Sequence, residues 1–408
     1  MTVDYSSAQR APLTESARAV LERLVAAGPT TRPMLSSLLN FSKPTMSAAV
    51  AELTNLGLVS PFGISQGPTG RKATVYGLGI EAGHVIGIDA GATQVRAIAR
   101  TLDGRILAEA EEPLAREHKH ISTETGAAIG NTMRLLRAAV GAAQGPLRAI
   151  SVAVPVIVSG NRPELADSTD LEILQESIGP TGGIRVLLEN NVNCAAVAEL
   201  HGGAARGRSS FAYLQVGVKI GLGIVHEGRL FRGFNGAAGE VARLPFPWSG
   251  QDTPSRNALE NYLGSRQLME RVWRDWPESE GPPPATARDL FDRARNGSAA
   301  ALGHVNRHAA DIGRLVASIV GVIDPGLIVL GGGVGQNALL LPEVGRTLAE
   351  LTWATEVATS SLGNRGSVLG ASQLAALAAL AELVGTDRAT LPPVLAMDQG
   401  ATEPAISS

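Results

Sequence analysis

The chain has 408 residues, of which 44% are hydrophobic and 4% aromatic, so disorder throughout is excluded and two or three domains with aliphatic cores are expected. Its single cysteine, Cys194, excludes a disulfide framework and a zinc site built from cysteines. No apolar run reaches about 18 residues and the N-terminus lacks a basic-then-apolar start, so we expect a cytoplasmic protein without a membrane span.

The charge is distributed unevenly along the chain. Residues 1–79 carry seven Lys or Arg and four Asp or Glu, whereas the remainder carries 28 and 34. A basic N-terminal part on an acidic remainder favours a nucleic-acid-binding module attached to a different kind of domain; the alternative is statistical scatter. Arginine richness alone indicates nothing, since 31 of the 35 basic residues in the whole chain are arginine.

The N-terminal part divides into a flexible arm, residues 1–13, and a patterned region, residues 14–79. Apolar positions at helical spacing predict three short helices in this region, and two strands follow them. Thr14 and Ser42 are suited to N-cap the first and third helices. The turn-rich segment 63–72 separates the two strands and predicts the tip of a β-hairpin.

Three helices and a β-hairpin in about 65 residues are typical of a winged helix-turn-helix DNA-binding domain. The third helix of such a domain enters the major groove, and the hairpin, or wing, reaches a phosphate or the minor groove. The start of the third helix and the wing tip supply the candidate DNA-contacting residues Ser42, Lys43, Thr45, Ser47, Arg71 and Lys72. The alternative is a plain three-helix packing module in which these residues are caps or solvated charges.

After a hinge near residues 79–83 the pattern becomes that of an α/β domain, expected to span residues 84–388 and to be followed by a flexible tail, residues 389–408. A first strand ends at Asp89 in a tight turn, where backbone N–H groups can meet phosphates. A later strand leads to an exposed polar knot, Glu189-Asn190-Asn191, and a helix. Glycines 331–333 follow the end of another strand, the edge of a sheet where α/β proteins bind ligands.

Residues 86–380 resemble the ROK family of bacterial sugar kinases and sugar-responsive repressors. The matching segments occur in the family's order and read IDAGAT, ENNVN, LQVGVKIGLGIV, GFNGAAGEV and DPGLIVLGGGV. The preceding winged helix, with SKPTMSAAVAELTNLGLV and GRK, resembles the DNA-binding head of the repressor branch. The resemblance implies an α/β fold class, with a two-lobed actin-like, ribonuclease-H-like body and a cleft between the lobes.

The sequence departs from the kinases of the family at the positions that carry their chemistry. Asn191 stands where these kinases have the Asp that takes the proton from the sugar hydroxyl, and an amide cannot act as that base. Arg243 replaces the His that binds sugar and zinc, and the segment WSGQDTPSRNALENYLG lacks the family's cysteines. The kinases' Gly-Thr-Gly turn reads Gly217-Val218-Lys219. We therefore predict no kinase activity, no cofactor and no metal.

The resemblance also assigns a ligand site and a vestigial phosphate site. The first comprises Asn190, Asn191, Glu240, Arg243 and Glu260, and the second Asp89, Gly91, Thr93 and Gly221. Alternatives stay open: the two asparagines can stabilise a turn, Glu260 can be a surface residue, and Asp89 and Thr93 can persist because the turn needs them. Arg243 either pairs with Glu240 or Glu260 and fills the pocket, or presents its guanidinium to an anionic sugar derivative.

Together these features predict a DNA-binding transcriptional regulator, a repressor of sugar-related genes, rather than an enzyme. Its partners are a double-stranded DNA operator and a sugar or sugar-derived effector. Because one head reads only a short half-site, we expect a homodimer or homotetramer. Two alternatives remain: an active ROK sugar kinase with a DNA-binding head, disfavoured by Asn191, and a regulator whose ROK body binds no sugar and serves as an oligomerisation scaffold.

Overall fold

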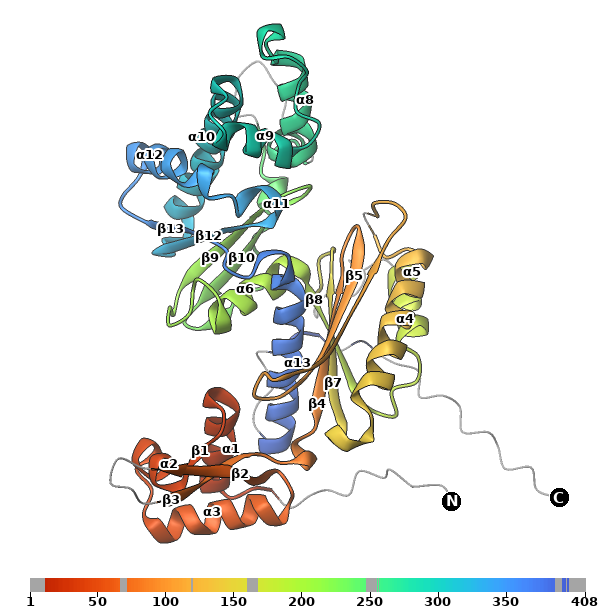
Figure 1. Ribbon diagram of the computed structural model, residues 1–408, viewed down its shortest axis with the longest axis vertical. Coiled ribbons are helices and arrows are strands. Elements are labelled where there is room, and N and C mark those ends of the chain that lie inside the picture. Colours follow the sequence, from red (N-terminus) through yellow and green to blue (C-terminus); the bar gives the residue numbers. More distant parts are fainter. Residues whose placement is uncertain are drawn as a thin grey trace, which may run out of the picture.

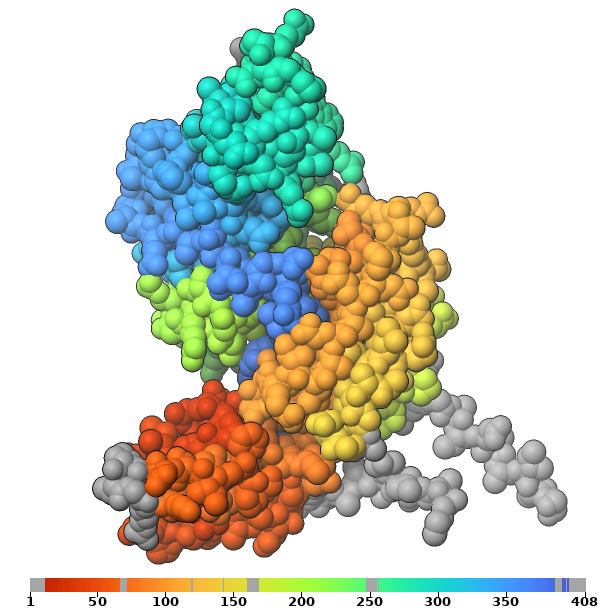
Figure 2. Space-filling model, in the orientation of Figure 1, coloured from red at the N-terminus to blue at the C-terminus, as the bar shows by residue number. Residues whose placement is uncertain are grey.

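The computed structural model describes residues 12–66, 72–118, 120–159, 168–246, 255, 257–385, 391–393 and 395. Figure 1 shows three bodies in succession: a small N-terminal head and two α/β lobes. In Figure 2 the head forms a separate mass below the two lobes. The predicted fold class, a winged helix-turn-helix followed by a two-lobed α/β body, is confirmed.

The head contains three helices and a three-stranded sheet of order β1-β3-β2. Its elements are α1 (Glu15–Ala27), β1 (Thr30–Thr31), α2 (Arg32–Leu39), α3 (Lys43–Asn55), β2 (Val59–Gln66) and β3 (Lys72–Leu78). Both predicted N-caps are confirmed, since the side chains of Thr14 and Ser42 accept hydrogen bonds from the backbone N–H groups of Ala17 and Thr45. The prediction of a turn from residue 63 is wrong, because β2 continues to Gln66 in register with β3.

The first lobe is built on a mixed sheet of order β6-β5-β4-β7-β8. Three antiparallel strands come first in the chain, and two parallel strands then extend the other side of β4. Helix α4 packs on β5 and β6 and contacts α5. The elements are β4 (His84–Ala90), β5 (Gln94–Thr101), β6 (Ile106–Pro113), α4 (Thr123–Val140), β7 (Leu147–Val154), α5 (Ser168–Ile178) and β8 (Arg185–Asn190).

The second lobe repeats this strand order as β11-β10-β9-β12-β13. Its strands are β9 (Phe211–Val216), β10 (Ile220–His226), β11 (Arg229–Leu230), β12 (Leu327–Gly331) and β13 (Glu356–Thr359). Its helices are α7 (Glu260–Leu263), α8 (Ser265–Asp275), α9 (Ala287–Arg295), α10 (Ala299–Ile323), α11 (Gly332–Gly335) and α12 (Leu341–Leu351). The buried apolar face of α10 supplies much of the core of this lobe.

Two helices join the three bodies. Helix α6 (Asn191–Gly202) follows the first sheet yet packs on β9 and β10 of the second lobe, while α13 (Gly366–Val384) follows the second sheet yet packs on β4 and β7 of the first. The two helices contact each other closely, and a side chain on Gly370 would come within 1.7 Å of the Cys194 carbonyl oxygen. The far end of α13 reaches the head, where Val384 is buried in the same core as Leu21 and Leu53.

The segment 363–384 is long and apolar enough to cross a membrane by length and composition alone. In this fold, however, α13 has both lobes and the head as packing partners, and twelve of its residues are buried. Its apolar character is therefore that of a core helix.

The expected hinge and part of the expected tail both make backbone hydrogen bonds in the structure. The expected hinge is a hydrogen-bonded corner, in which Gly79 and Glu81 donate their N–H groups to the carbonyls of Leu58 and Gly57 at 2.8 and 3.1 Å. Part of the expected tail is also ordered. Leu188 donates to the Pro393 carbonyl at 3.0 Å and Leu395 donates to the Val186 carbonyl at 2.8 Å, so this segment covers the open edge of β8.

Candidate functional site

A cavity of about 360 Å³ lies between the lobes, where the start of α6 faces the start of β10. Five predicted ligand residues line it together: Asn190, Asn191, Glu240, Arg243 and Glu260. They come from the β8–α6 junction, the loop that follows β11, and α7. The structure thus brings together side chains that are up to 70 positions apart in the sequence.

The polar knot is organised by Asn190, which is the N-cap of α6. Its Oδ1 accepts from the N–H groups of Val192 and Asn193 at 2.9 and 3.4 Å, and its Nδ2 donates to the Val156 carbonyl at 3.1 Å. These contacts use both side-chain oxygen lone pairs and one of the two amide hydrogens. Asn190 therefore holds the wall of the cavity in shape, which is the turn-stabilising role left open above, and has one donor left for a ligand.

The knot also depends on an ion pair that sequence reasoning missed. Glu189, predicted to be exposed, is 1% exposed, and its Oε2 lies 2.6 Å from Nε of Arg232. Its Oε1 accepts from the Asn190 N–H and from Nδ2 of Asn193, both at 2.9 Å. Since Glu189 and Arg232 are 43 residues apart, no local pattern signals this contact.

The acidic residues of the cavity each have a protein partner. Nε of Arg243 lies 3.3 Å from Oε2 of Glu240. This is one of the ion pairs that the sequence analysis considered for Arg243. The cavity nevertheless stays open, because the Arg243 side chain is 52% exposed and extends along its rim. Oε2 of Glu260 accepts from the Ile220 N–H at 3.3 Å, which ties α7 to the first residue of β10. A surface role for Glu260 is therefore not supported.

A second cavity of about 240 Å³ adjoins the first and contains most of the predicted phosphate site. Asp89, Gly91 and Thr93 line it, together with glycines of the β9–β10 turn and of the start of α11. Burial raises the pKa of the Asp89 carboxyl to about 7, and the nearby Arg96 guanidinium opposes this rise in part. Oδ1 of Asp89 has no hydrogen-bond partner among the described residues.

Gly221 does not belong with that group. It lines the first cavity, not the second, and a side chain at this position would come within 2.8 Å of Cγ2 of Val192. The residue is glycine because β10 and α6 pack closely at this point. Its assignment to the phosphate site is therefore not supported.

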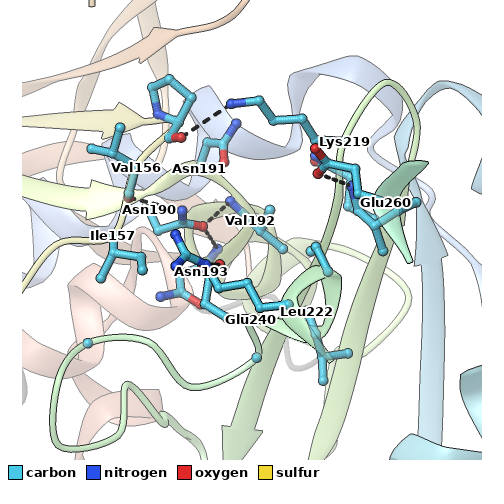
Figure 3. A pocket seen from close by; sticks show the side chains of 18 of the residues that line it. Val156, Ile157, Asn190, Asn191, Val192, Asn193, Lys219, Leu222, Glu240 and Glu260 are labelled. Carbon is cyan, nitrogen blue, oxygen red and sulfur yellow. Dashed lines mark hydrogen bonds and ion pairs between the residues drawn. The ribbon is translucent and has the colours of Figure 1, made fainter. Parts of the chain in front are cut away.

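Lys219 is a further cavity residue that was not assigned from the sequence. It lies on the turn between β9 and β10 and lines both cavities, and its Nζ is 3.5 Å from the Pro155 carbonyl oxygen on the opposite wall. Figure 3 shows its side chain reaching across the cleft beside Asn191. The sequence signal for Lys219 was that Gly217-Val218-Lys219 differs from the Gly-Thr-Gly turn of the kinases. Only the fold shows where the lysine amine lies.

The candidate DNA-contacting residues that the structure describes are all exposed. Ser42, Lys43, Thr45 and Ser47 are exposed at the start of α3, and Lys72 is exposed at the start of β3. The hydroxyl groups of Ser42 and Thr45 lie 2.7 Å apart, so a ligand at this helix start meets two coupled hydroxyls. Arg71 lies outside the described residues.

The segment that lacks the zinc-binding cysteines of the family lies partly outside the described part of the chain, at residues 247–254 and 256. Among the described residues, no three His, Cys, Asp or Glu side chains are grouped as a metal would require. The absence of zinc stays a prediction.

Comparisons with known proteins identify the family of the chain. The chain is 22% identical over 371 residues to a xylose repressor of Bacillus spizizenii, covering 87% of this chain and 93% of the relative. Its fold matches a ROK family transcriptional regulator, a homologue of the E. coli Mlc protein, with a TM-score of 0.70, 18% identity and coverage of 90% and 96%. A ROK hexokinase from Thermus thermophilus matches with a TM-score of 0.55, 30% identity and coverage of 72% and 98%. The ROK family model matches residues 85–378, and the chain therefore belongs to the ROK family.

Proposed function

We propose that the protein is a DNA-binding transcriptional repressor of sugar-related genes, whose kinase-like body binds a ligand and transfers no phosphate. The observation that carries this proposal is the path of α13. The helix begins at the second cavity, where the Ser367 hydroxyl donates to the Asn191 carbonyl at 3.1 Å, and ends in the core of the head at Val384.

This path gives a ligand in the cleft a mechanical connection to the DNA-binding surface. A helix of 19 residues is about 28 Å long and shifts as a rigid element. A ligand that moves the knot or the lobes will therefore bias the position of α13, and with it the head. Such a ligand changes operator affinity only as far as it prefers one arrangement of the lobes.

The alternative function, an active sugar kinase, is disfavoured because the chain lacks the catalytic base that would accept the proton of the sugar hydroxyl. Asn191 lines both cavities, where a phosphoryl group would pass from one to the other, and its amide has no basic lone pair at neutral pH. Lys219 at the same junction supplies charge but no acceptor for the hydroxyl proton. We expect no ADP production when ATP is mixed with glucose, xylose or N-acetylglucosamine, and turnover above background would support the kinase instead.

DNA binding is tested by selecting binding sites from random double-stranded DNA and then measuring affinity for the selected site at several salt concentrations. Lys43→Ala and Lys72→Ala should each reduce the salt slope by about one unit, since each removes one phosphate contact. Arg137→Ala, an exposed change on α4 of the body, is the matched control and should leave the slope unchanged. Equal slopes for all three variants would remove these lysines from the interface.

The oligomeric state follows from the same proposal. Two heads on a palindromic site require a homodimer or homotetramer joined through the body. Light scattering of the full chain should give twice or four times the 42.2 kDa mass of the chain. A monomer bound to a single half-site would contradict this part of the proposal.

A further inference from the structure

The C-terminal end of the described chain, residues 391–393 and 395, lies along the edge of the first sheet, and we call these residues the strap. Leu188 of β8 donates its N–H to the Pro393 carbonyl at 3.0 Å, and Leu395 donates to the Val186 carbonyl at 2.8 Å. As the residue number rises along β8 it falls along the strap, which is the arrangement of an antiparallel pair. The strap therefore acts as a further strand beside β8, the edge strand of the first sheet.

Two leucines of the strap anchor it on opposite faces of this sheet. Leu395 is 5% exposed and belongs to the core between the sheet and the helices α4 and α5. Leu391 packs instead against the cluster on the other face, which contains Leu187 and residues of α13. Pro392 and Pro393 lie between the two leucines and restrict the backbone, which lowers the entropy lost when the strap docks.

The cluster that Leu391 covers also joins the head to the body. Val25 of α1, Leu78 of β3 and Leu383 of α13 pack against the same cluster. Only five residues separate Gly385, the C-cap of α13, from Leu391, so the strap begins within about 22 Å of the helix end. The strap thus reaches from the joint between head and first lobe to β8.

Two other elements connect the head to the first lobe, and a residue of each belongs to this joint. The chain passes from β3 to β4 through the corner at residues 79–83, which follows Leu78. Helix α13 packs on the first sheet and enters the core of the head at Val384, which follows Leu383. Connections of this kind can bend at the loops beside them. A side chain that packs on the same cluster, and that the strap ties to β8, resists such bending.

We propose that the strap fixes the direction of the head on the first lobe, and so holds the two heads of a dimer at the spacing that a palindromic site requires. This inference rests on the proposed function, since it concerns how the DNA-binding head is held. None of the described strap residues belongs to the core of the head, so without the strap the head keeps its fold but takes a range of directions. Binding to two half-sites at once then loses the advantage of preorganisation, whereas binding to one half-site does not.

The first measurement is the distance distribution between two spin labels, one on α1 and one on α4. The labels are attached at Glu22→Cys and Ala138→Cys, both exposed positions, and the buried Cys194 stays unlabelled. Labelled chains are diluted with unlabelled chains, so that each oligomer carries one pair. We expect a narrow distribution that becomes at least about twofold broader in a chain that ends at residue 390 and in Leu391→Ser.

Two controls match these variants. A chain that ends at residue 395 keeps the strap and removes only residues beyond it, and Leu351→Ser makes the same substitution on α12, at a leucine that is 58% exposed. Both should give the distribution of the unaltered chain. Leu391→Ser also guards against misfolding of the shortened chain, because Leu391 is only partly buried and lies outside the core that holds Leu395.

The second measurement is affinity for a selected palindromic site and for one of its half-sites. The chain that ends at residue 390 and Leu391→Ser should bind the palindrome at least about tenfold more weakly than the unaltered chain. Their affinity for the half-site should not change. The two controls should bind both sites as the unaltered chain does.

The outcomes separate this inference from the proposed function. Unchanged label distances in the shortened chain and in Leu391→Ser would overturn the inference whatever the DNA result. An equal loss of affinity for the palindrome and the half-site would also overturn it, because the head itself would then be damaged rather than its direction. If the unaltered chain binds no DNA, the proposed function fails, and the label distances alone decide whether the strap holds the head.

Discussion

The two lobes share one strand order but put different ionisable groups, a carboxyl and an ammonium, into the cleft between them. In each lobe the turn between the first two strands faces the second cavity. In the first lobe this turn follows Asp89, a buried carboxyl, and in the second lobe it contains Lys219, an ammonium. The repeated topology supplies equivalent positions, and the residue placed at each position decides its chemistry.

The helix that follows the last strand differs between the lobes in length. Helix α6 has 12 residues and α13 has 19, about 18 and 28 Å. Both cross to the opposite sheet, and only the longer one continues into the core of the head. A difference of two helical turns therefore distinguishes a helix that joins two lobes from one that joins three bodies.

The largest expected effect comes from breaking the crossing of these two helices. Gly370→Ala places a methyl group 1.7 Å from the Cys194 carbonyl oxygen, a backbone atom that cannot move without shifting α6. We expect the unfolding free energy to fall by at least about 3 kcal/mol, measured by urea denaturation followed by circular dichroism.

Gly303→Ala is the matched control for that change. This glycine lies inside α10, and a side chain there meets nothing within 4 Å. The substitution should stabilise the protein by about 0.5–1 kcal/mol, since alanine favours a helix more than glycine does. Equal effects of the two substitutions would show that the helices do not cross as closely as described.

The next effect concerns the acidic turn of the first lobe. Folded protein retains the Asp89 proton up to about pH 7, whereas the unfolded chain releases it near pH 3.8. The unfolding free energy therefore falls as pH rises through this window. Asp89→Asn should remove about 2–3 kcal/mol of that decline between pH 5 and pH 8. Parallel denaturation curves of the two proteins across this range would contradict the burial of this carboxyl.

The smallest effect concerns the end of α13. Val384→Ala removes two methyl groups from the core of the head, where the side chain is 2% exposed, and should cost about 1–2 kcal/mol. Val322→Ala removes the same atoms from a position on α10 that is 83% exposed, and should change stability by less than about 0.5 kcal/mol. If the two variants melt at the same temperature, α13 does not pack into the head.

Much of the fold was predictable because its signals are local. The caps at Thr14 and Ser42 and the long helix α10 follow from residues within a few positions of each other. The failures share a different cause. The corner at residues 79–83 was expected to be a hinge, and the segment at Pro393 and Leu395 to be part of a flexible tail. Each makes backbone hydrogen bonds to residues far away in the sequence, the corner to the turn at Gly57 and Leu58 and the segment to β8.

In the candidate site, too, some features were predictable from the sequence and others depended on contacts between distant residues. Motif order alone grouped Asn191, Glu240 and Glu260, and the structure places them around one cavity. Gly221 was misassigned, because a glycine needed for packing against Val192 looks the same in sequence as one needed by a phosphate. Lys219 was overlooked as a cavity residue, because the sequence shows that the threonine of the kinases is missing but not where the lysine side chain points.

By itself the sequence determined the class of the protein: a basic winged helix on an α/β body, with Asn191 where a kinase needs a base. These properties depend on residue identity and short-range periodicity. Only the tertiary structure decided which charges meet. It paired Arg243 with Glu240 and Arg232 with Glu189, and it placed Lys219 at the junction of two cavities. Charges act through distance, and the fold alone sets the distance between residues that are far apart in the chain.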